Sequence, residues 1–288
     1  MTSAPMRALV AAFGGVLPDL ATGPLLEWLD EFSALHWDFR NGAERFEARD
    51  WDGAPELNAL VLDSARALGL VVPRAPARDG YDHLLVLGGL TAACLQRTAY
   101  AALVIAGGLT VGEVAALGSF RPLNPAELAR LGADGDRYEV DALDLGVREA
   151  FGLATPSTRR GSEGPPAPES WRHDTYEPAG RTPVHVLAAP ASGHRANTAD
   201  TYEFWADRLR VQPGSTVLIV TTPIYVPFQH GDAVRILSGI AGCHVETVGL
   251  DQDRLAPGMR GEPFSPGRHL QEIRSAIRSM HRLYESAR

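Results

Sequence analysis

The stretch Leu84-Leu-Val-Leu-Gly-Gly89 decides the fold of this chain of 288 residues. An apolar run that does not alternate with polar residues is typical of a strand buried on both faces, as in parallel sheets. Similar runs begin at Val184, Thr216 and His244, and a weaker one covers residues 113–117. Helical patterns lie between them, and this alternation predicts an α/β fold with a doubly wound, mostly parallel sheet of about five strands.

The chain is expected to have two parts. Residues 1–75 predict a helical N-terminal extension, because Leu25, Leu29 and Phe32 repeat at the spacing of one helix face. Residues 76–288 predict the α/β domain. Its helices are expected at residues 92–104, 125–131, 198–209, 230–238 and 268–285.

Residues 155–183 differ from the rest of the α/β domain because they are rich in Pro, Gly, Ser and charged residues. Loops of this length in compact domains are usually functional lids or irregular segments. Trp171 and Tyr176 indicate that part of the segment is ordered. The sequence therefore predicts a long loop, which is either a functional lid or a disordered segment or surface excursion.

The composition limits the classes of function. The formal net charge is −8, and the basic residues form no cluster of the kind that binds nucleic acid. No apolar stretch approaches the roughly 20 residues of a membrane span. Cys94 and Cys243 lie far apart, and no group of residues has metal-ligand spacing. We expect a soluble cytoplasmic protein with reduced thiols and without metal, nucleic-acid or membrane partners, and a homodimer is left open.

The candidate site is expected in the loops after the strands, because ligands of open α/β sheets bind beyond the carboxyl ends of the strands. Gly88 and Gly89 permit a tight turn and a close backbone approach to a ligand, and Arg97 follows in the next helix. The N-terminus of that helix offers N–H groups to an anion. The spacing is not GxGxxG, so the dinucleotide fingerprint is absent from the sequence.

A second loop begins with Ser119, after the weaker strand. Arg121 follows in a proline-stiffened segment, and its guanidinium suits a carboxylate or phosphate. Glu127 lies at the start of the next helix. It is either an acid of the site or a carboxylate that favours the helix dipole.

A third loop carries Ser192, His194, Arg195, Asn197 and Thr198 ahead of a helix. Asn197 or Thr198 is suited to be the N-cap of that helix, and this role needs no ligand. A cap does not explain the density of polar groups around it, and we expect ligand contacts from His194 and Arg195.

A fourth loop carries Thr222, Tyr225, Gln229 and His230, and two prolines limit its freedom. These side chains offer hydrogen bonds or an acid–base group. A structural alternative for His230 is a helix cap or a pair with Asp232.

In chain order, the motifs of these loops resemble those of the YdcF/SanA-like family of Rossmann-like α/β proteins. The matching motifs lie within about residues 82–250 and are Leu87-Gly88-Gly89, Arg97, Gly118-Ser119 with Glu127, Arg195-Ala-Asn197-Thr198-Ala-Asp200-Thr201 and Val220-Thr221-Thr222-Pro-Ile-Tyr225. The chain departs from the family's Ser, Asn, His and Arg, where it has Arg195, Thr201, Tyr225 and Phe228. The resemblance implies a Rossmann-like fold and a pocket for a nucleotide-like ligand, with S-adenosylmethionine or a nucleotide as cofactor candidates.

The leading hypothesis is an enzyme that acts on a small anionic or nucleotide-like metabolite, for example a transferase with a nucleotide-type cosubstrate. The residues expected to be catalytic are His194, Tyr225, His230 and Glu127. The residues expected to bind cofactor or substrate are Gly88, Gly89, Arg97, Ser119, Arg121, Ser192, Arg195, Asn197, Thr198, Thr222 and Gln229. The alternatives are a non-catalytic regulatory protein that binds a nucleotide or S-adenosylmethionine, and a metal-independent hydrolase.

Overall fold

The computed structural model describes residues 2–39, 51, 53–193 and 196–288. Backbone contacts divide the chain into two compact units. The first unit comprises Met1–Pro73, Pro223–Arg235 and Glu262–Arg288, and the second comprises Arg74–Thr222 and Ile236–Gly261. The sequence suggested one boundary near residue 75, whereas this division also groups the C-terminal segment with the N-terminal one.

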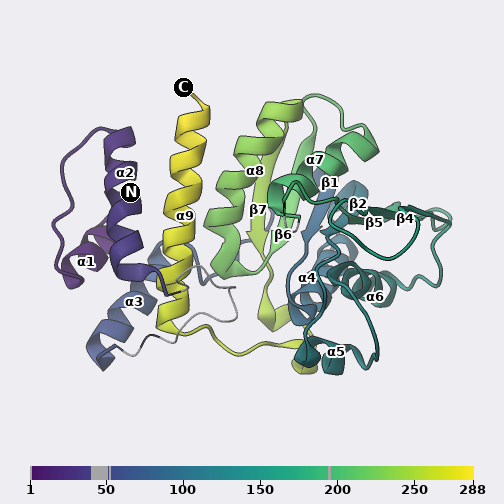
Figure 1. Ribbon diagram of the computed structural model, residues 1–288, viewed down its shortest axis with the longest axis horizontal. Helices are drawn as coiled ribbons and strands as arrows, with labels where there is room; N and C mark the ends of the chain where they lie inside the picture. The colour runs from purple at the N-terminus through teal and green to yellow at the C-terminus, as the bar shows by residue number, and fades with distance from the viewer. Residues whose placement is uncertain (1, 40–50, 52, 194–195) are drawn as a thin grey trace. The chain divides into compact units, whose positions relative to one another are not determined.

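The second unit contains a seven-stranded sheet in the order β3-β4-β5-β2-β1-β6-β7 (Figure 1). The strands are β1 (Gly80–Leu87), β2 (Thr110–Gly118), β3 (Thr158–Gly161), β4 (Arg172–Tyr176), β5 (Val184–Ala188), β6 (Thr216–Thr221) and β7 (His244–Gly249). The strands β5, β2, β1, β6 and β7 run parallel to their neighbours in this row. The expected mostly parallel α/β sheet is therefore confirmed, and these are the strands that the apolar runs predicted.

The order of the parallel strands reverses at one place. From β1 the chain moves outward to β2 and β5, and it then returns to the other side of β1 for β6 and β7. Because the strands are parallel, the loops after β1, β2 and β6 leave the sheet at the same edge. This edge is where the candidate residues of the second unit belong.

The segment 155–183 holds two strands where the sequence suggested a long loop. β3 pairs antiparallel with β4, and β4 pairs antiparallel with β5. Asp174, which is fully buried on β4, accepts 2.8 Å hydrogen bonds from Arg159 and Arg172. These ion pairs satisfy the charges that make the segment look irregular in sequence.

Helices lie on both faces of the sheet. The helices of the second unit are α4 (Thr91–Ala106), α5 (Pro125–Leu131), α6 (Glu139–Phe151) and α7 (Thr198–Leu209), followed by the short 3-10 turns η3 (Gln252–Arg254) and η4 (Pro257–Met259). α8 (Val226–Ala241) belongs in part to each unit. α6 is an element that the sequence analysis did not anticipate.

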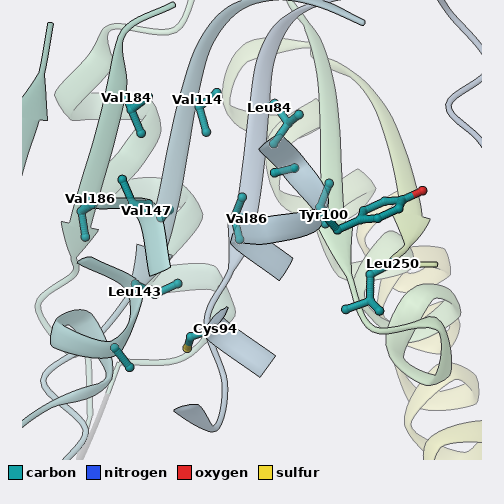
Figure 2. Close-up of a cluster of buried hydrophobic side chains, with 14 of the residues drawn as sticks. Leu84, Val86, Cys94, Tyr100, Val114, Leu143, Val147, Val184, Val186 and Leu250 are labelled. Carbon is teal, nitrogen blue, oxygen red and sulfur yellow. The ribbon is translucent and has the colours of Figure 1, made fainter. Parts of the chain in front are cut away.

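The main core of the second unit lies between the sheet and the helices α4 and α6. Figure 2 shows Val86 and Val114 of neighbouring strands near Leu143 and Val147 of α6, and all four side chains are buried. Successive residues of a strand point to opposite faces. His83, beside Leu84, accordingly lies edge-on to Trp205 of α7, so α7 covers the other face.

The first unit is helical. Its elements are α1 (Ala4–Ala12), α2 (Thr22–Trp37), α3 (Pro55–Ala67), η2 (Pro223–Tyr225) and α9 (Pro266–Ser286). Leu9, Leu29, Val61 and Ile273 from four of these helices share one buried apolar cluster. The expected N-terminal helical region is confirmed. None of the helices in the described part of the chain is long and apolar enough to span a membrane.

Candidate functional site

A carboxylate lies at the carboxyl ends of β1 and β2. The Ser119 hydroxyl, just after β2, donates a 2.6 Å hydrogen bond to Oε2 of Glu139, the first residue of α6. On the other side, a Cβ atom at Gly88 would lie 2.7 Å from Glu139 Oε1 and 2.9 Å from the Leu117 carbonyl oxygen. Glycine at the end of β1 therefore allows the Glu139 carboxylate to bridge the two strand ends.

A second carboxylate caps α4. Leu90 is the N-cap residue of α4 and provides no side-chain cap, and the backbone N–H of Thr91 donates a 3.0 Å hydrogen bond to Glu127 Oε1. Glu127 is 5% exposed and also accepts a hydrogen bond from the Asn124 backbone N–H. A carboxylate at this place suits the partial positive charge of a helix N-terminus. Glu127 thus stabilises the N-terminus of the neighbouring helix α4 as well as that of its own helix α5.

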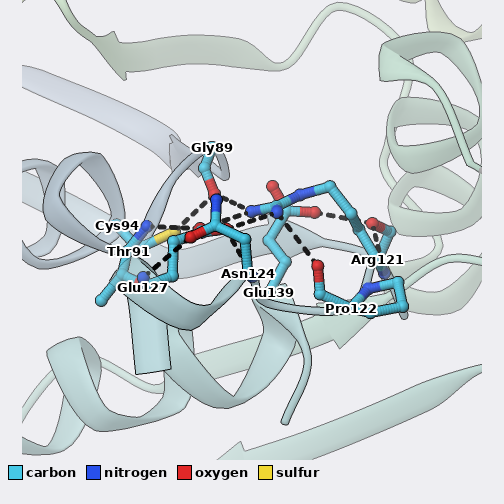
Figure 3. A network of polar contacts seen from close by, with 9 residues as sticks. Gly89, Thr91, Cys94, Arg121, Pro122, Asn124, Glu127 and Glu139 are labelled. Carbon is cyan, nitrogen blue, oxygen red and sulfur yellow. Dashed lines mark hydrogen bonds and ion pairs between the residues drawn. The ribbon is translucent and has the colours of Figure 1, made fainter. Parts of the chain in front are cut away.

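Arg121 pairs with Glu127 through both terminal nitrogens of its guanidinium. Nη1 donates to Glu127 Oε2 over 2.8 Å, and Nη2 donates to Glu127 Oε1 over 2.9 Å. Nη2 also donates to the Gly89 carbonyl oxygen over 2.8 Å (Figure 3). Burial opposes ionisation of Glu127, but these hydrogen bonds outweigh it and lower the pKa of its carboxyl. The anion that Arg121 holds here is a side chain of the protein itself.

Arg97 ties the ends of β1 and β6 together. It is 2% exposed, and its Nη1 donates a 2.7 Å hydrogen bond to the Leu87 carbonyl oxygen. Its Nε and Nη2 atoms donate to the Thr222 hydroxyl over 3.1 and 3.0 Å. Arg97 and Thr222, both expected at the ligand, thus meet each other where the strand order reverses.

Cys94 adjoins this group, because its thiol donates a 3.5 Å hydrogen bond to the Gly89 carbonyl oxygen, but it is a poor nucleophile. Burial raises the pKa of its thiol to about 12, and the negative charge of Glu139 contributes to the rise. A thiol that stays protonated is a poor nucleophile. Cys94 and Cys243 are both buried and not disulfide-bonded.

The loop before α7 is described in part. Asn197 is the N-cap of α7, because its Oδ1 atom accepts hydrogen bonds of 2.7 and 3.3 Å from the backbone N–H groups of Ala199 and Asp200. Thr198 is the first residue of that helix, and Ser192 is exposed. The predicted ligand contacts His194 and Arg195 lie outside the described residues.

The first unit contains Tyr225, Gln229 and His230, whereas the second unit contains Glu139. The Tyr225 ring lies edge-on to Phe264, with 6.2 Å between the ring centres. Gln229 is buried, whereas His230 is exposed. The structure brings Gly88, Gly89, Arg97, Ser119, Arg121, Glu127 and Thr222 together in the second unit.

Sequence reasoning missed Glu139, the residue that bridges the strand ends. A signal was present, because Tyr138-Glu-Val-Asp141 has an acid three residues after the N-cap, and Val140, Leu143 and Val147 follow at helical spacing. Asp141 Oδ2 accepts a 2.9 Å hydrogen bond from the Tyr138 backbone N–H and completes this cap. Among the described residues, no three His, Cys, Asp or Glu side chains form a group suited to a metal ion.

Comparison with known proteins finds relatives over nearly the whole chain. A family model described as the Rv3785 N-terminal domain matches residues 1–69. The chain is 33% identical to the uncharacterized protein Rv3785 of Mycobacterium tuberculosis over 312 residues, which cover 97% of this chain and 86% of that protein. The uncharacterized protein Mb3814 of Mycobacterium bovis matches with the same identity and coverage. No solved structure matches the chain.

Proposed function

The chain belongs to the same family as the mycobacterial protein Rv3785, and we propose that it is an enzyme acting on a nucleoside-type metabolite at the carboxyl ends of β1 and β2. We also propose that the chain is related to the YdcF/SanA-like family and that its fold is Rossmann-like. The observation that carries it is the Glu139 carboxylate, held by Ser119 at the end of the second strand of the sheet.

The strand order supports a ligand at this edge. Counted along the chain, the parallel strands have the order 3-2-1-4-5, which matches the first five strands of the 3-2-1-4-5-6 order of dinucleotide-binding sheets. In such sheets the ligand lies outside the carboxyl ends of the strands, where the order reverses. In this chain the reversal falls between β1 and β6, next to the glycines that follow β1.

The position of Glu139 favours a ligand with vicinal hydroxyls. An ionised carboxylate accepts hydrogen bonds and donates none, and a ribose provides two hydroxyl donors. Dinucleotide-binding sheets use an acidic residue for the ribose. Glu139 comes from α6 instead of from the second strand itself, but its partner Ser119 directly follows that strand. A nucleoside ribose on Glu139 is therefore the binding mode we propose.

The available chemistry favours proton transfer by Glu139. The chain contains 27 arginines and no lysine, so no side-chain amine forms a Schiff base with a carbonyl substrate. Cys94 stays protonated because burial raises the pKa of its thiol to about 12. A partly exposed carboxylate beside a hydroxyl accepts a proton from a substrate hydroxyl in a transfer reaction.

Ligand binding tests the proposal. Adenosine, S-adenosylmethionine and S-adenosylhomocysteine are to be titrated by calorimetry into the wild-type chain and into Glu139→Gln and Ser119→Ala. Hydrogen bonds to a charged group contribute about 1.5–3 kcal/mol, so Glu139→Gln should weaken binding roughly tenfold to a hundredfold. Glu149→Gln, an exposed position on the same helix, is the matched control.

The outcomes separate the functional classes. Binding that depends on Glu139, together with turnover of the bound nucleoside, supports an enzyme. Binding that depends on Glu139 without turnover of any nucleoside supports the regulatory alternative. Equal affinity in Glu139→Gln, Glu149→Gln and wild type would reject the role of Glu139.

A further inference from the structure

We propose that the Glu127 carboxylate occupies an oxyanion-binding site at the N-terminus of α4. By occupying it, Glu127 selects ligands that carry no phosphate at this position. The choice of ligand rests on the proposed function, whereas the filling of the place stands on the geometry of Glu127 alone.

The environment of Glu127 is that of an oxyanion site. Four N–H groups converge on its carboxylate: the backbone N–H groups of Thr91 and Asn124, and Nη1 and Nη2 of Arg121, at distances of 2.8–3.1 Å. Phosphate sites combine the same donors, namely the N–H groups of a helix N-terminus and a guanidinium fork. Figure 3 shows Glu127, Thr91 and Arg121 gathered beside Gly89.

A buried hydroxyl on the residue that binds Glu127 through its backbone gives a second indication. Thr91 is fully buried, and its Oγ1 atom has no hydrogen-bond partner in the described part of the chain. A carboxylate has two oxygens, and in Glu127 both already accept hydrogen bonds from Arg121. A tetrahedral oxyanion has more acceptor oxygens than a carboxylate, so it can serve the same four N–H donors and accept from one further hydroxyl.

The charges around Glu127 oppose a phosphate in the wild-type chain. Arg121 forms a two-pronged ion pair with Glu127, so its charge is already neutralised. Glu139 lies close enough to Arg121 to raise the pKa of that guanidinium. A phosphate at α4 would meet two carboxylates, whereas an uncharged or cationic nucleoside would not.

The experiment removes the carboxylate and offers inorganic oxyanions. The melting temperatures of wild type and Glu127→Ala are compared in sodium chloride, phosphate and sulfate of equal ionic strength. Relative to chloride, phosphate or sulfate should raise the melting temperature of Glu127→Ala by about 3 °C or more beyond the rise seen in the wild type. The wild-type chain should show only the general stabilisation that phosphate and sulfate give to folded proteins.

Two further variants separate oxyanion binding from general salt effects. Glu127→Gln keeps the volume of the side chain, so it should respond as the wild type does. The double variant Arg121→Ala with Glu127→Ala lacks the guanidinium, so the oxyanion response should disappear. A folded Glu127→Ala chain whose melting temperature rises no more in phosphate than that of the wild type would overturn the proposal.

Backbone amide spectra of the wild-type chain test the proposal without any variant. Inorganic phosphate should leave the amide signals of Thr91 and Asn124 unchanged, and saturable shifts of both signals would contradict a filled site. If no nucleoside binds to any form while Glu127→Ala still binds phosphate, the proposed function fails and the oxyanion assignment stands. If nucleosides bind to the wild type and their 5′-phosphates bind equally well, the selection by Glu127 fails.

Discussion

The Nε2 atom of His173 lies 3.1 Å from the Nδ1 atom of His185, on the neighbouring strands β4 and β5. One ring must donate the proton and the other must accept it, so the contact requires at least one neutral imidazole. The chain of polar groups continues across the sheet, because Glu113 Oε2 lies 3.8 Å from His185 Nε2 and Glu113 Oε1 lies 2.8 Å from His83 Nδ1.

This histidine pair predicts loss of stability in acid. Burial, His185 and Arg208 together lower the pKa of His173 to about 4, and burial lowers the pKa of His185 despite the opposing charge of Glu113. The unfolded chain, with a histidine pKa of about 6.5, binds more protons than the folded chain between the two values. Stability should therefore be complete above pH 6.5 and decline as the pH falls towards 4.

Urea unfolding at pH 7.5, 6, 5 and 4.5 measures this decline. His173→Gln should lose less stability over this range than the wild type, by roughly 1–2 kcal/mol after allowance for partial exposure. The exposed His244→Gln is the control and should follow the wild-type curve. Parallel curves for His173→Gln and wild type would show that the pair does not set the acid response.

Asp174 should be the most sensitive carboxylate of the β3–β4 segment. Its side chain is fully buried and accepts hydrogen bonds from Arg159 and Arg172. Removing one partner of a buried ion pair typically costs about 3–5 kcal/mol. Asp174→Asn should reduce the free energy of unfolding by this order, whereas the exposed Asp207→Asn should change it by less than about 0.5 kcal/mol. Equal urea midpoints would refute the structural role of Asp174.

Two adjacent threonines at the end of β6 should respond differently to the same substitution. The Thr222 hydroxyl accepts two hydrogen bonds from Arg97, so Thr222→Val should cost about 1–3 kcal/mol. The Thr221 hydroxyl is buried without a partner among the described residues, so Thr221→Val should be neutral or stabilising. Thermal or urea unfolding of both variants decides, and a larger loss in Thr221→Val would contradict the Arg97 contact.

Gly88 should not tolerate a methyl group. A Cβ atom there would collide with the Glu139 carboxylate and the Leu117 carbonyl oxygen, whereas Gly258 has open space at the corresponding position. Gly88→Ala should cost about 1–3 kcal/mol and should displace Glu139, as in other overpacked sites. Gly258→Ala should unfold at the wild-type urea concentration. Unchanged stability and unchanged nucleoside affinity in Gly88→Ala would argue against the bridging position of Glu139.

The parallel strands were predictable because β1, β5 and β6 carry nearly continuous apolar runs, and β2 and β7 carry weaker apolar patterns in the same alternation with helices. β3 and β4 were not, because their stability comes from partners elsewhere in the chain. Every residue of β3 is exposed, and β4 carries Arg172 and Asp174. A local pattern contains no sign that Asp174 would be buried with its charge neutralised by Arg159 and Arg172.

The location of the candidate site was more predictable than the tasks of its residues. Strand ends and glycines placed Gly88, Ser119 and Arg121 at one edge, because the edge follows from the parallel arrangement. The sequence does not show that both terminal nitrogens of Arg121 would donate hydrogen bonds to Glu127. Such pairing depends on the distance between loops, and local patterns do not encode that distance.

The buried Arg97 guanidinium joins the ends of two strands, and its partner Thr222 lies 125 residues further along the chain. Separating β1 from β6 would strip several hydrogen bonds from a buried cation at once. The floor of the proposed site should therefore be rigid before a metabolite binds. Little of the binding free energy should be lost to rearrangement of the protein. Association would then follow a single exponential whose rate rises linearly with metabolite concentration, without a plateau from a slow opening step.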